Sequence, residues 1–299
     1  MKVHLCNSLS KSAWKQYRAH WKKISAFTRS TLNKPPRPAS KYTVALYATH
    51  LHNAGLKSTS VRSHLSAIAF FHKIHGLSNP SKSFLIEKLL AGYRKQDKPI
   101  PVRRPISIQL LQSLIGALHS DRALTSYDKS LYKALFSVMY HAALRSSEVC
   151  FARNSAHALT QNEINLFRHK GSTFLKITLH SCKHSRQPIP PMILHPASHG
   201  ACPVKLYYKF SKLRVSQGSL AFRFEDGSPL TRRVLSTVLK NVLPAIHCNP
   251  HYFNTHSFRI GRATDMAREG FSTTQIAAAG RWKSDAFLRY IKPSYVHCH

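Results

Sequence analysis

Acidic residues are scarce in this chain. Its 299 residues include 45 Lys and Arg but only 11 Asp and Glu, which leaves a formal net charge of +34 at pH 7. Most soluble enzymes mix the two signs nearly evenly, so this excess indicates a polyanionic partner. A two-metal nuclease site, which needs clustered carboxylates, is hard to build from so few acids. Both halves are basic, which favours a body that wraps a polyanion over a neutral domain with a basic arm.

The chain also lacks the signatures of several other protein classes. Its six cysteines include no C-x-x-C pair, and no two ligand pairs have a zinc-binding spacing. No G-x-x-x-x-G-K-[ST] phosphate-binding loop is present, and no run approaches the roughly 18 apolar residues of a membrane span. We therefore expect an intracellular protein with reduced cysteines, no metal, no small-molecule cofactor and no membrane contact.

What the chain does contain is enough apolar material for a core. Hydrophobic residues make up 43% of it and aromatic residues 10%, which argues against disorder. In the first hundred residues, apolar side chains recur at intervals of three or four in four segments, so four helices are predicted there. These segments are 14–27, 44–51, 61–74 and 84–93. We expect an all-α domain over residues 1–98.

A basic, proline-rich stretch follows this domain. Between Gly92 and Pro105 the sequence has three prolines and five basic residues, which predicts an extended, charged linker at residues 99–105. An ordinary loop inside one domain is the alternative. Such a linker can lie along a phosphate backbone, which makes the basic residues in it and just before it candidate nucleic-acid contacts. They are Arg94, Lys95, Lys98, Arg103 and Arg104.

Residues 106–299 combine helical and strand patterns. Alternating side chains predict three strands, at 163–167, 172–179 and 187–194. Helical spacing recurs before and after them, so we expect an α+β domain with helices around a small antiparallel sheet. The predicted helices lie at about 110–114, 131–139, 202–215, 229–246, 255–268, 272–280 and 284–290.

Polar residues with possible chemical roles occur at three places in this second half. His256 and Arg259 are three residues apart, so on a helix they share one face and can converge on one anion near the helix N-terminus. Upstream, Arg145 ends an apolar helix and Glu148 follows three residues later. Downstream, Gly-Arg-Trp precedes an apolar segment that ends with Tyr290. Each motif alone is unspecific, and their order along the chain is the stronger signal.

In that order the motifs resemble the tyrosine recombinase (phage integrase) family. That family has an Arg in a Leu-Arg-x-x-Glu context, a Lys on a β-hairpin turn, His-x-x-Arg, a Trp or His after Gly, and then a nucleophilic Tyr. The resemblance extends to the first half, because a basic four-helix core-binding domain and a linker precede the catalytic domain in the family. It implies a core-binding domain at 1–98 and a catalytic domain at 106–299. The stretch 279–291 is most similar to recombinases of mobile elements, including those of retrotransposons.

The resemblance implies a role for each matching residue. Tyr290 would attack a DNA phosphate to form a 3′-phosphotyrosyl bond and free a 5′-hydroxyl, while Arg145 and Arg259 hold the non-bridging oxygens. Lys183 would protonate the leaving oxygen, and His256 would assist proton transfer at the tyrosine. Trp282 would hydrogen-bond the phosphate or pack against the nucleophile, and Glu148 would orient the helix that begins at Arg145. Arg262 is expected to contact the DNA.

Three of these positions have competitors in the sequence. Trp282 and Tyr290 are one residue closer than is usual in the family, so Arg281 is an alternative at the Trp/His position. Lys183 lies in the turn between two predicted strands and is preferred to two other lysines, and Tyr290 is preferred to a second tyrosine. These competitors are Lys170, Lys176 and Tyr295.

The predicted function is therefore site-specific recombination or integration of DNA. We expect double-stranded DNA as the partner, a homotetramer on two DNA segments, and location with the DNA, in the nucleus of a eukaryote or the cytoplasm or nucleoid of a bacterium. A type IB topoisomerase-like DNA relaxer is an alternative with the same tyrosine chemistry. A DNA-binding protein descended from a mobile element and no longer catalytic is an alternative from another class, and an RNA-binding protein would explain only the charge.

Overall fold

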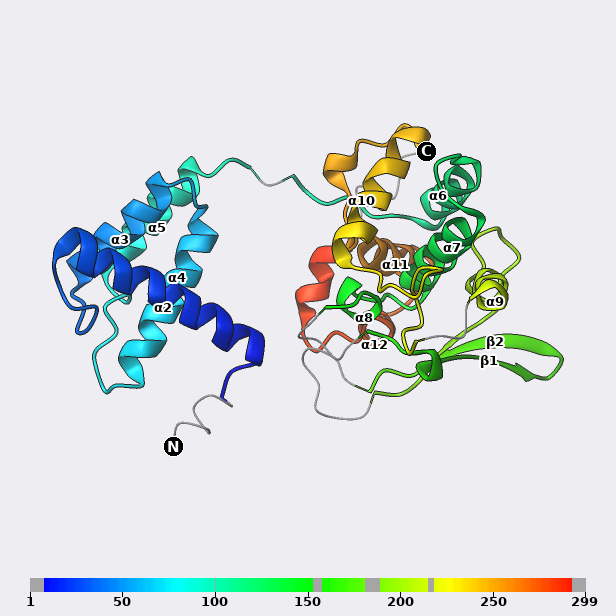
Figure 1. Cartoon of the computed structure of the whole chain (residues 1–299), viewed down its shortest axis with the longest axis horizontal. Coiled ribbons are helices and arrows are strands. Elements are labelled where there is room, and N and C mark those ends of the chain that lie inside the picture. The colour runs from blue at the N-terminus through cyan, green and yellow to red at the C-terminus, as the bar shows by residue number, and fades with distance from the viewer. Residues whose placement is uncertain (1–7, 100, 153–157, 181–188, 215–217, 292–299) are drawn as a thin grey trace. The chain divides into compact units, whose positions relative to one another are not determined.

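The chain divides into two compact units. Unit 1 spans Met1–Ile100 and unit 2 spans Pro101–His299. A computed structural model describes residues 8–99, 101–152, 158–180, 189–214 and 218–291, without the side chains of Ala286 and Tyr290. Figure 1 shows the elements of both units along the chain. No helix in these ranges is long and apolar enough to cross a membrane.

In its described part, unit 1 consists of four α-helices. Serines cap three of them: the side chains of Ser10, Ser40 and Ser83 each accept a hydrogen bond from a backbone N–H of the first turn. The first helix ends at Asn33, which adopts the left-handed conformation (φ 48°). The bounds are α2 (Lys11–Leu32), α3 (Lys41–Asn53), α4 (Ser58–Lys73) and α5 (Phe84–Gln96).

The apolar faces of these helices form a core of their own. Ile24, Val44, Val61 and Ile86, one from each helix, are at most 1% exposed. The buried His64 takes part in this core because its Nδ1 lies 2.9 Å from the hydroxyl of Tyr47. Unit 1 therefore packs independently, and its proposed role in DNA binding stays a prediction.

The first helices of unit 2 pack around α7. The bounds are α6 (Ile108–Ser120), α7 (Ser126–His141) and the single turn α8 (Ser146–Val149). Helix α7 is buried on nearly every side, since it packs against α6, α9 and α11. The rings of Phe136 on α7 and Phe258 on α11 lie 5.0 Å apart in this core.

A small antiparallel sheet follows, with the strand order β1-β2-β3. Strand β1 (Ile164–His169) pairs with β2 (Ser172–Ile177) through a turn at Lys170 and Gly171, and β2 pairs with β3 (Met192–Leu194). Figure 1 shows β1 and β2 as a hairpin that projects from the helices. The α+β prediction is confirmed, but the strand predicted at 187–194 is too long. Pro190 and Pro191 cannot donate backbone hydrogen bonds, so the described strand begins only at Met192.

Helices resume after the sheet and recur as far as Tyr290. Residues 284–290, predicted as an α-helix, instead form the 3-10 helix η4 (Asp285–Tyr290). The other bounds are η1 (Gln161–Glu163), α9 (Pro203–Leu213), α10 (Arg232–Val242), η2 (Leu243–Ile246), η3 (Pro250–Tyr252), α11 (Ser257–Arg268) and α12 (Thr273–Gly280).

Gly261 allows α11 to pack against the segment that enters unit 2. A Cβ at this position would lie 1.7 Å from the carbonyl oxygen of Ile106, so no other residue fits there without movement of the backbone. The same segment is tied to α11 by a hydrogen bond of 3.0 Å from the Ile106 amide to the Ser257 carbonyl. This close approach fixes the start of α11, where His256 and Arg259 lie.

Candidate active site

Arg145 and Glu148 form a local pair at the start of α8. The guanidinium Nη1 of Arg145 donates to Glu148 Oε1 over 2.9 Å, and the Arg145 amide donates to Oε2 over 2.8 Å. The Glu148 side chain is buried, whereas about a quarter of the Arg145 side chain (23%) is exposed. The carboxylate therefore fixes the Nη1 side of the Arg145 guanidinium, while part of the side chain remains exposed.

Arg259 lies in the first turn of α11 and is fully buried. Its Nη1 donates to the carbonyl oxygen of Ala143 over 2.5 Å, and its Nη2 donates to the carbonyl oxygen of Gly280. The ring of Trp282 covers the guanidinium, with 4.4 Å from Cζ to the ring centroid, a cation–π contact. Three segments distant in sequence therefore meet at Arg259.

Trp282 reaches this position because Gly280 has no side chain. A Cβ at Gly280 would lie 1.8 Å from the indole ring. The indole also stacks on Phe287, with ring centroids 5.3 Å apart and an interplanar angle of 20°. Phe287 belongs to η4, which ends at Tyr290, so the tyrosine-bearing segment is packed through Trp282 onto Arg259.

Arg281 occupies the same junction and is almost completely buried. Its Nη2 donates to Glu148 Oε2 over 3.0 Å and to the Ala143 carbonyl over 3.3 Å, while its Nη1 donates to the Ala142 carbonyl over 3.0 Å. The residue has a left-handed backbone (φ 56°) at the end of α12. Sequence reasoning considered Arg281 only as an alternative to Trp282 and missed these contacts.

His256 is the residue that precedes α11, and its surroundings keep its imidazole neutral. Burial, followed by the positive charges of Arg259, Arg145 and Arg232, lowers the pKa of His256 to about 4. A neutral imidazole has a lone pair that can accept a proton, and an anion bound beside these arginines would raise the pKa from this low value. Arg232, the exposed first residue of α10, was not predicted, since nothing in its sequence context distinguishes it from other surface arginines.

The junction holds more positive than negative charge. Arg145 and Arg281 share a single carboxylate, that of Glu148, and Arg259 donates to two backbone carbonyls. Buried cations that exceed their counter-ions favour the binding of an anion, and guanidinium groups suit phosphate in particular. Within the described ranges, no three His, Cys, Asp or Glu side chains come together in a way that could hold a metal ion.

The remaining predicted catalytic residues are not all described. The side chain of Tyr290 lies outside the described part of the structure, as do Lys183 and the competing Tyr295. Lys170 lies in the turn between β1 and β2, and Lys176 is exposed on β2. The preference for Lys183 and Tyr290 over their competitors therefore stays a prediction.

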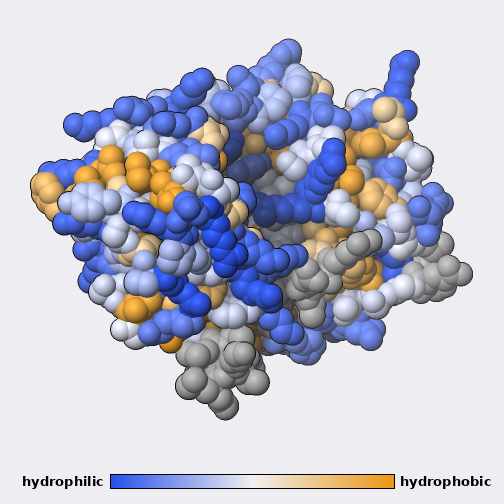
Figure 2. Space-filling model, turned by 60° about the vertical axis from the view of Figure 1, so that its left-hand side comes forward, coloured by the Kyte–Doolittle hydropathy of each residue, from blue (hydrophilic) through white to orange (hydrophobic). Residues whose placement is uncertain are grey.

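The predicted DNA contacts lie at several separate places. Arg94 and Lys95 are exposed on the last turn of α5, and Lys98 is exposed just beyond it. Arg103 and Arg104 contact η3: Arg103 Nη1 donates to the His251 carbonyl over 2.6 Å, and Arg104 lies 4.6 Å from the Tyr252 ring centroid. Figure 2 shows a face on which hydrophilic residues predominate and hydrophobic ones form small patches.

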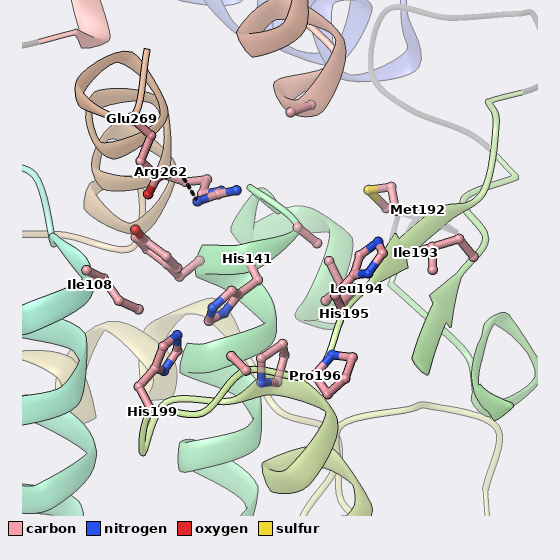
Figure 3. A pocket seen from close by; sticks show the side chains of 15 residues that line it. Ile108, His141, Met192, Ile193, Leu194, His195, Pro196, His199, Arg262 and Glu269 are labelled. Atoms are coloured by element: carbon pink, nitrogen blue, oxygen red, sulfur yellow. Dashed lines mark ion pairs between the residues drawn. The ribbon is translucent and has the colours of Figure 1, made fainter. Parts of the chain in front are cut away.

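Arg262 faces a separate cavity of about 590 Å³. There it pairs with Glu269, with 3.6 Å between Nη1 and Oε2, as Figure 3 shows. His141 and His199 line the same cavity, with their rings nearly parallel and 5.7 Å apart. Burial lowers the pKa of His141 to about 4. Arg145, His256 and Arg259 are not among the residues that line this cavity.

Comparison with known proteins identifies a matching family and similar folds. The profile of the Phage integrase family matches residues 109–297. Among curated proteins, none is similar enough to count as a match. Among the solved structures that resemble the fold at low identity are three complexes with DNA. They are the Tn1549 transposon integrase in complex with circular intermediate DNA (TM-score 0.66, 14% identity, 97% of this chain and 92% of that one), the XerH site-specific recombinase bound to its difH substrate (0.62, 13%, 93% and 74%) and a lambda integrase dimer bound to a COC′ core site (0.62, 13%, 100% and 76%).

Proposed function

Because the chain belongs to the phage integrase family and is a tyrosine recombinase, we propose that it cuts and rejoins duplex DNA at specific sites through a covalent bond between Tyr290 and a DNA 3′-phosphate. The observation that supports this most is the cluster at the start of α11. There Arg259 is linked through Trp282 and Phe287 to the segment that carries Tyr290, and the charges of Arg259 and Arg145 act on a neutral His256. The three structures named above, which it resembles, are of two integrases and one recombinase bound to DNA.

In the proposed reaction, the Tyr290 hydroxyl attacks the phosphate and displaces the 5′-oxygen of the next nucleotide. Arg145 and Arg259 stabilise the negative charge that develops on the non-bridging oxygens. His256, neutral at pH 7, accepts the tyrosine proton, and Lys183 donates a proton to the leaving oxygen. The reverse reaction restores the phosphodiester, so the chemistry needs neither a metal nor a nucleotide.

Access to Arg259 requires a movement in this mechanism. Its guanidinium is fully buried under Trp282, which in turn stacks on Phe287 of η4. For a phosphate to reach Arg259, the groups that cover its guanidinium must shift, among them Trp282 and the η4 residue stacked on it. DNA binding and placement of the nucleophile are therefore coupled in the proposed function.

The proposed substrate is double-stranded DNA, held by basic residues of both units. A protein that neutralises many phosphates loses affinity steeply as salt rises. We propose that a homotetramer brings two DNA segments together for strand exchange, as a mobile-element recombinase or integrase would require. Association with DNA inside the cell follows from this role.

The test is a trapping experiment with a pool of duplexes of random sequence that carry a nick. Cleavage next to a nick releases a short strand, so the covalent complex cannot religate and accumulates. We expect the wild-type chain to form adducts that survive denaturation and the Tyr290→Phe variant to bind the pool without forming any. An adduct in that variant would refute the assignment of Tyr290. Complete failure of the wild type would favour the non-catalytic alternative, and relaxation of supercoiled plasmid without recombination would favour the topoisomerase-like one.

A further inference from the structure

Arg281 connects the segments on which the proposed catalytic residues lie. It follows α12 directly and leads into η4, yet its guanidinium contacts the end of α7 and the carboxylate of Glu148 in α8. Its Nη1 also contacts the sulfur of Met192 in β3. With 9% of its side chain exposed, it is an internal residue of this junction.

The carboxylate of Glu148 is shared between two arginines. Oε1 accepts from Arg145, and Oε2 accepts from both the Arg145 amide and the Arg281 guanidinium. A buried carboxylate held at both oxygens has little freedom to turn. Loss of Arg281 would leave only Arg145 to hold Glu148 and would thereby loosen the carboxylate that orients the Arg145 guanidinium.

The carbonyl of Ala143 is shared in a similar way. It accepts from Arg259 Nη1 over 2.5 Å and from Arg281 Nη2 over 3.3 Å. Ala143 has a left-handed backbone (φ 44°), a conformation that a non-glycine residue keeps only when its surroundings impose it. Arg281 therefore helps to hold the acceptor that orients Arg259 as well.

We propose that Arg281 is a positioning residue that sets the orientation of both Arg145 and Arg259 and does not itself bind the phosphate. This inference rests on the proposed function. The competing interpretation is that Arg281 acts on the DNA directly, at the place where the family has Trp or His. The two differ in whether the effect of Arg281 depends on Glu148.

The substrate is a nicked duplex that the wild-type chain selects from the random pool. The experiment is a double-mutant cycle in which cleavage of this duplex is measured. The variants are Arg281→Ala, Glu148→Gln and the two combined. Arg268→Ala is the matched control, because Arg268 also pairs with a buried carboxylate, that of Asp265 over 3.3 Å, but on the far part of α11. Single-turnover cleavage and DNA affinity are measured for each variant.

We expect Arg281→Ala to slow cleavage about 10- to 100-fold, the size of effect that small misplacements of catalytic groups produce, and to leave DNA affinity within about twofold. Glu148→Gln should have a similar effect, and the combined variant should be no slower than the slower single one. Arg281→Lys should recover part of the rate, because one ammonium can still reach Glu148. Cleavage by Arg268→Ala should stay within about twofold of the wild type.

Two results would overturn the positioning role: cleavage by Arg281→Ala at the wild-type rate, or losses in the single variants that multiply in the combined one. If Arg281→Ala does not fold, Arg281→Lys replaces it in the double-mutant cycle with Glu148→Gln. Absence of any wild-type adduct would instead count against the proposed function.

A second measurement tests the positioning role without DNA. The chain has three tryptophans, and Trp14 and Trp21 lie in unit 1. With both replaced by Phe, fluorescence reports on Trp282 alone. Arg281→Ala and Glu148→Gln should both shift the Trp282 emission, because its partner Arg259 is released, whereas Arg268→Ala should not. An unchanged emission in Arg281→Ala would overturn the proposal whether or not cleavage is seen.

Discussion

Replacement of Gly261 by Ala is expected to disrupt the second unit at the base of the proposed active site. The added Cβ would lie 1.7 Å from the Ile106 carbonyl oxygen and 2.5 Å from its carbon, whereas real Cβ contacts stay above 3.0 Å. The α11 helix or the Ile106 segment must therefore move by more than 1 Å. Both are backbone, so no side chain can turn away to relieve the contact.

The magnitude follows from this geometry. Overpacking costs about 1–3 kcal/mol when side chains can adjust, so a backbone obstacle should cost at least about 3 kcal/mol. For a unit of this size, that corresponds to a fall in Tm of roughly 6–12 °C. Because α11 also carries Arg259, cleavage should fall as well.

The assay is thermal unfolding monitored by calorimetry, and Gly116→Ala is the matched control. Gly116 is also inside a helix, but a Cβ there meets no atom within 4 Å. Ala at that position should therefore stabilise unit 2 by about 1 kcal/mol, from helix propensity alone. If Gly261→Ala unfolds at the wild-type temperature, the close approach of α11 and Ile106 described above is wrong.

Two further predictions concern pH and salt. Burial lowers the pKa of His64, His141 and His256 to about 4, against 6.5 for an exposed imidazole, so the unfolded chain binds more protons than the folded one between these values. Stability against urea should thus be greatest above about pH 6.5 and fall as the pH drops toward 4; constant stability over that window would contradict the burial of these rings. The salt dependence of binding to a nonspecific duplex can be measured by filter binding or anisotropy. Replacing one residue that contacts a phosphate by Ala should reduce the steepness of log affinity against log salt by about 0.9. An unchanged slope would show that the replaced residue does not contact the DNA. The residues to test in this way are Arg94, Lys95 and Lys98.

Local features of the structure were predictable from the sequence. Helical spacing located the helices of both units, because periodicity of apolar residues reflects burial directly. His256 and Arg259 are three residues apart and so lie on the same helical turn. Arg145 and Glu148 have the same spacing, and their side chains form an ion pair. These relations depend on neighbours in sequence.

Contacts between distant segments were not predictable in this way. Arg281 reaches Glu148 across 133 positions, and Arg259 reaches Ala143 across 116. The sequence around Arg281 indicates only an exposed helix end, so its burial and its role at the junction emerge from packing alone. The need for Gly261 likewise arises from Ile106, which lies far away in the sequence.

The central claim is that Tyr290 becomes covalently attached to DNA. The most direct measurement is mass spectrometry of peptides from the trapped complex after nuclease digestion. The proposed function predicts a nucleotide on the peptide that contains Tyr290, with fragment ions that assign it to Tyr290 and not to Tyr295. A nucleotide on Tyr295, on a serine or on no residue of the chain would contradict it.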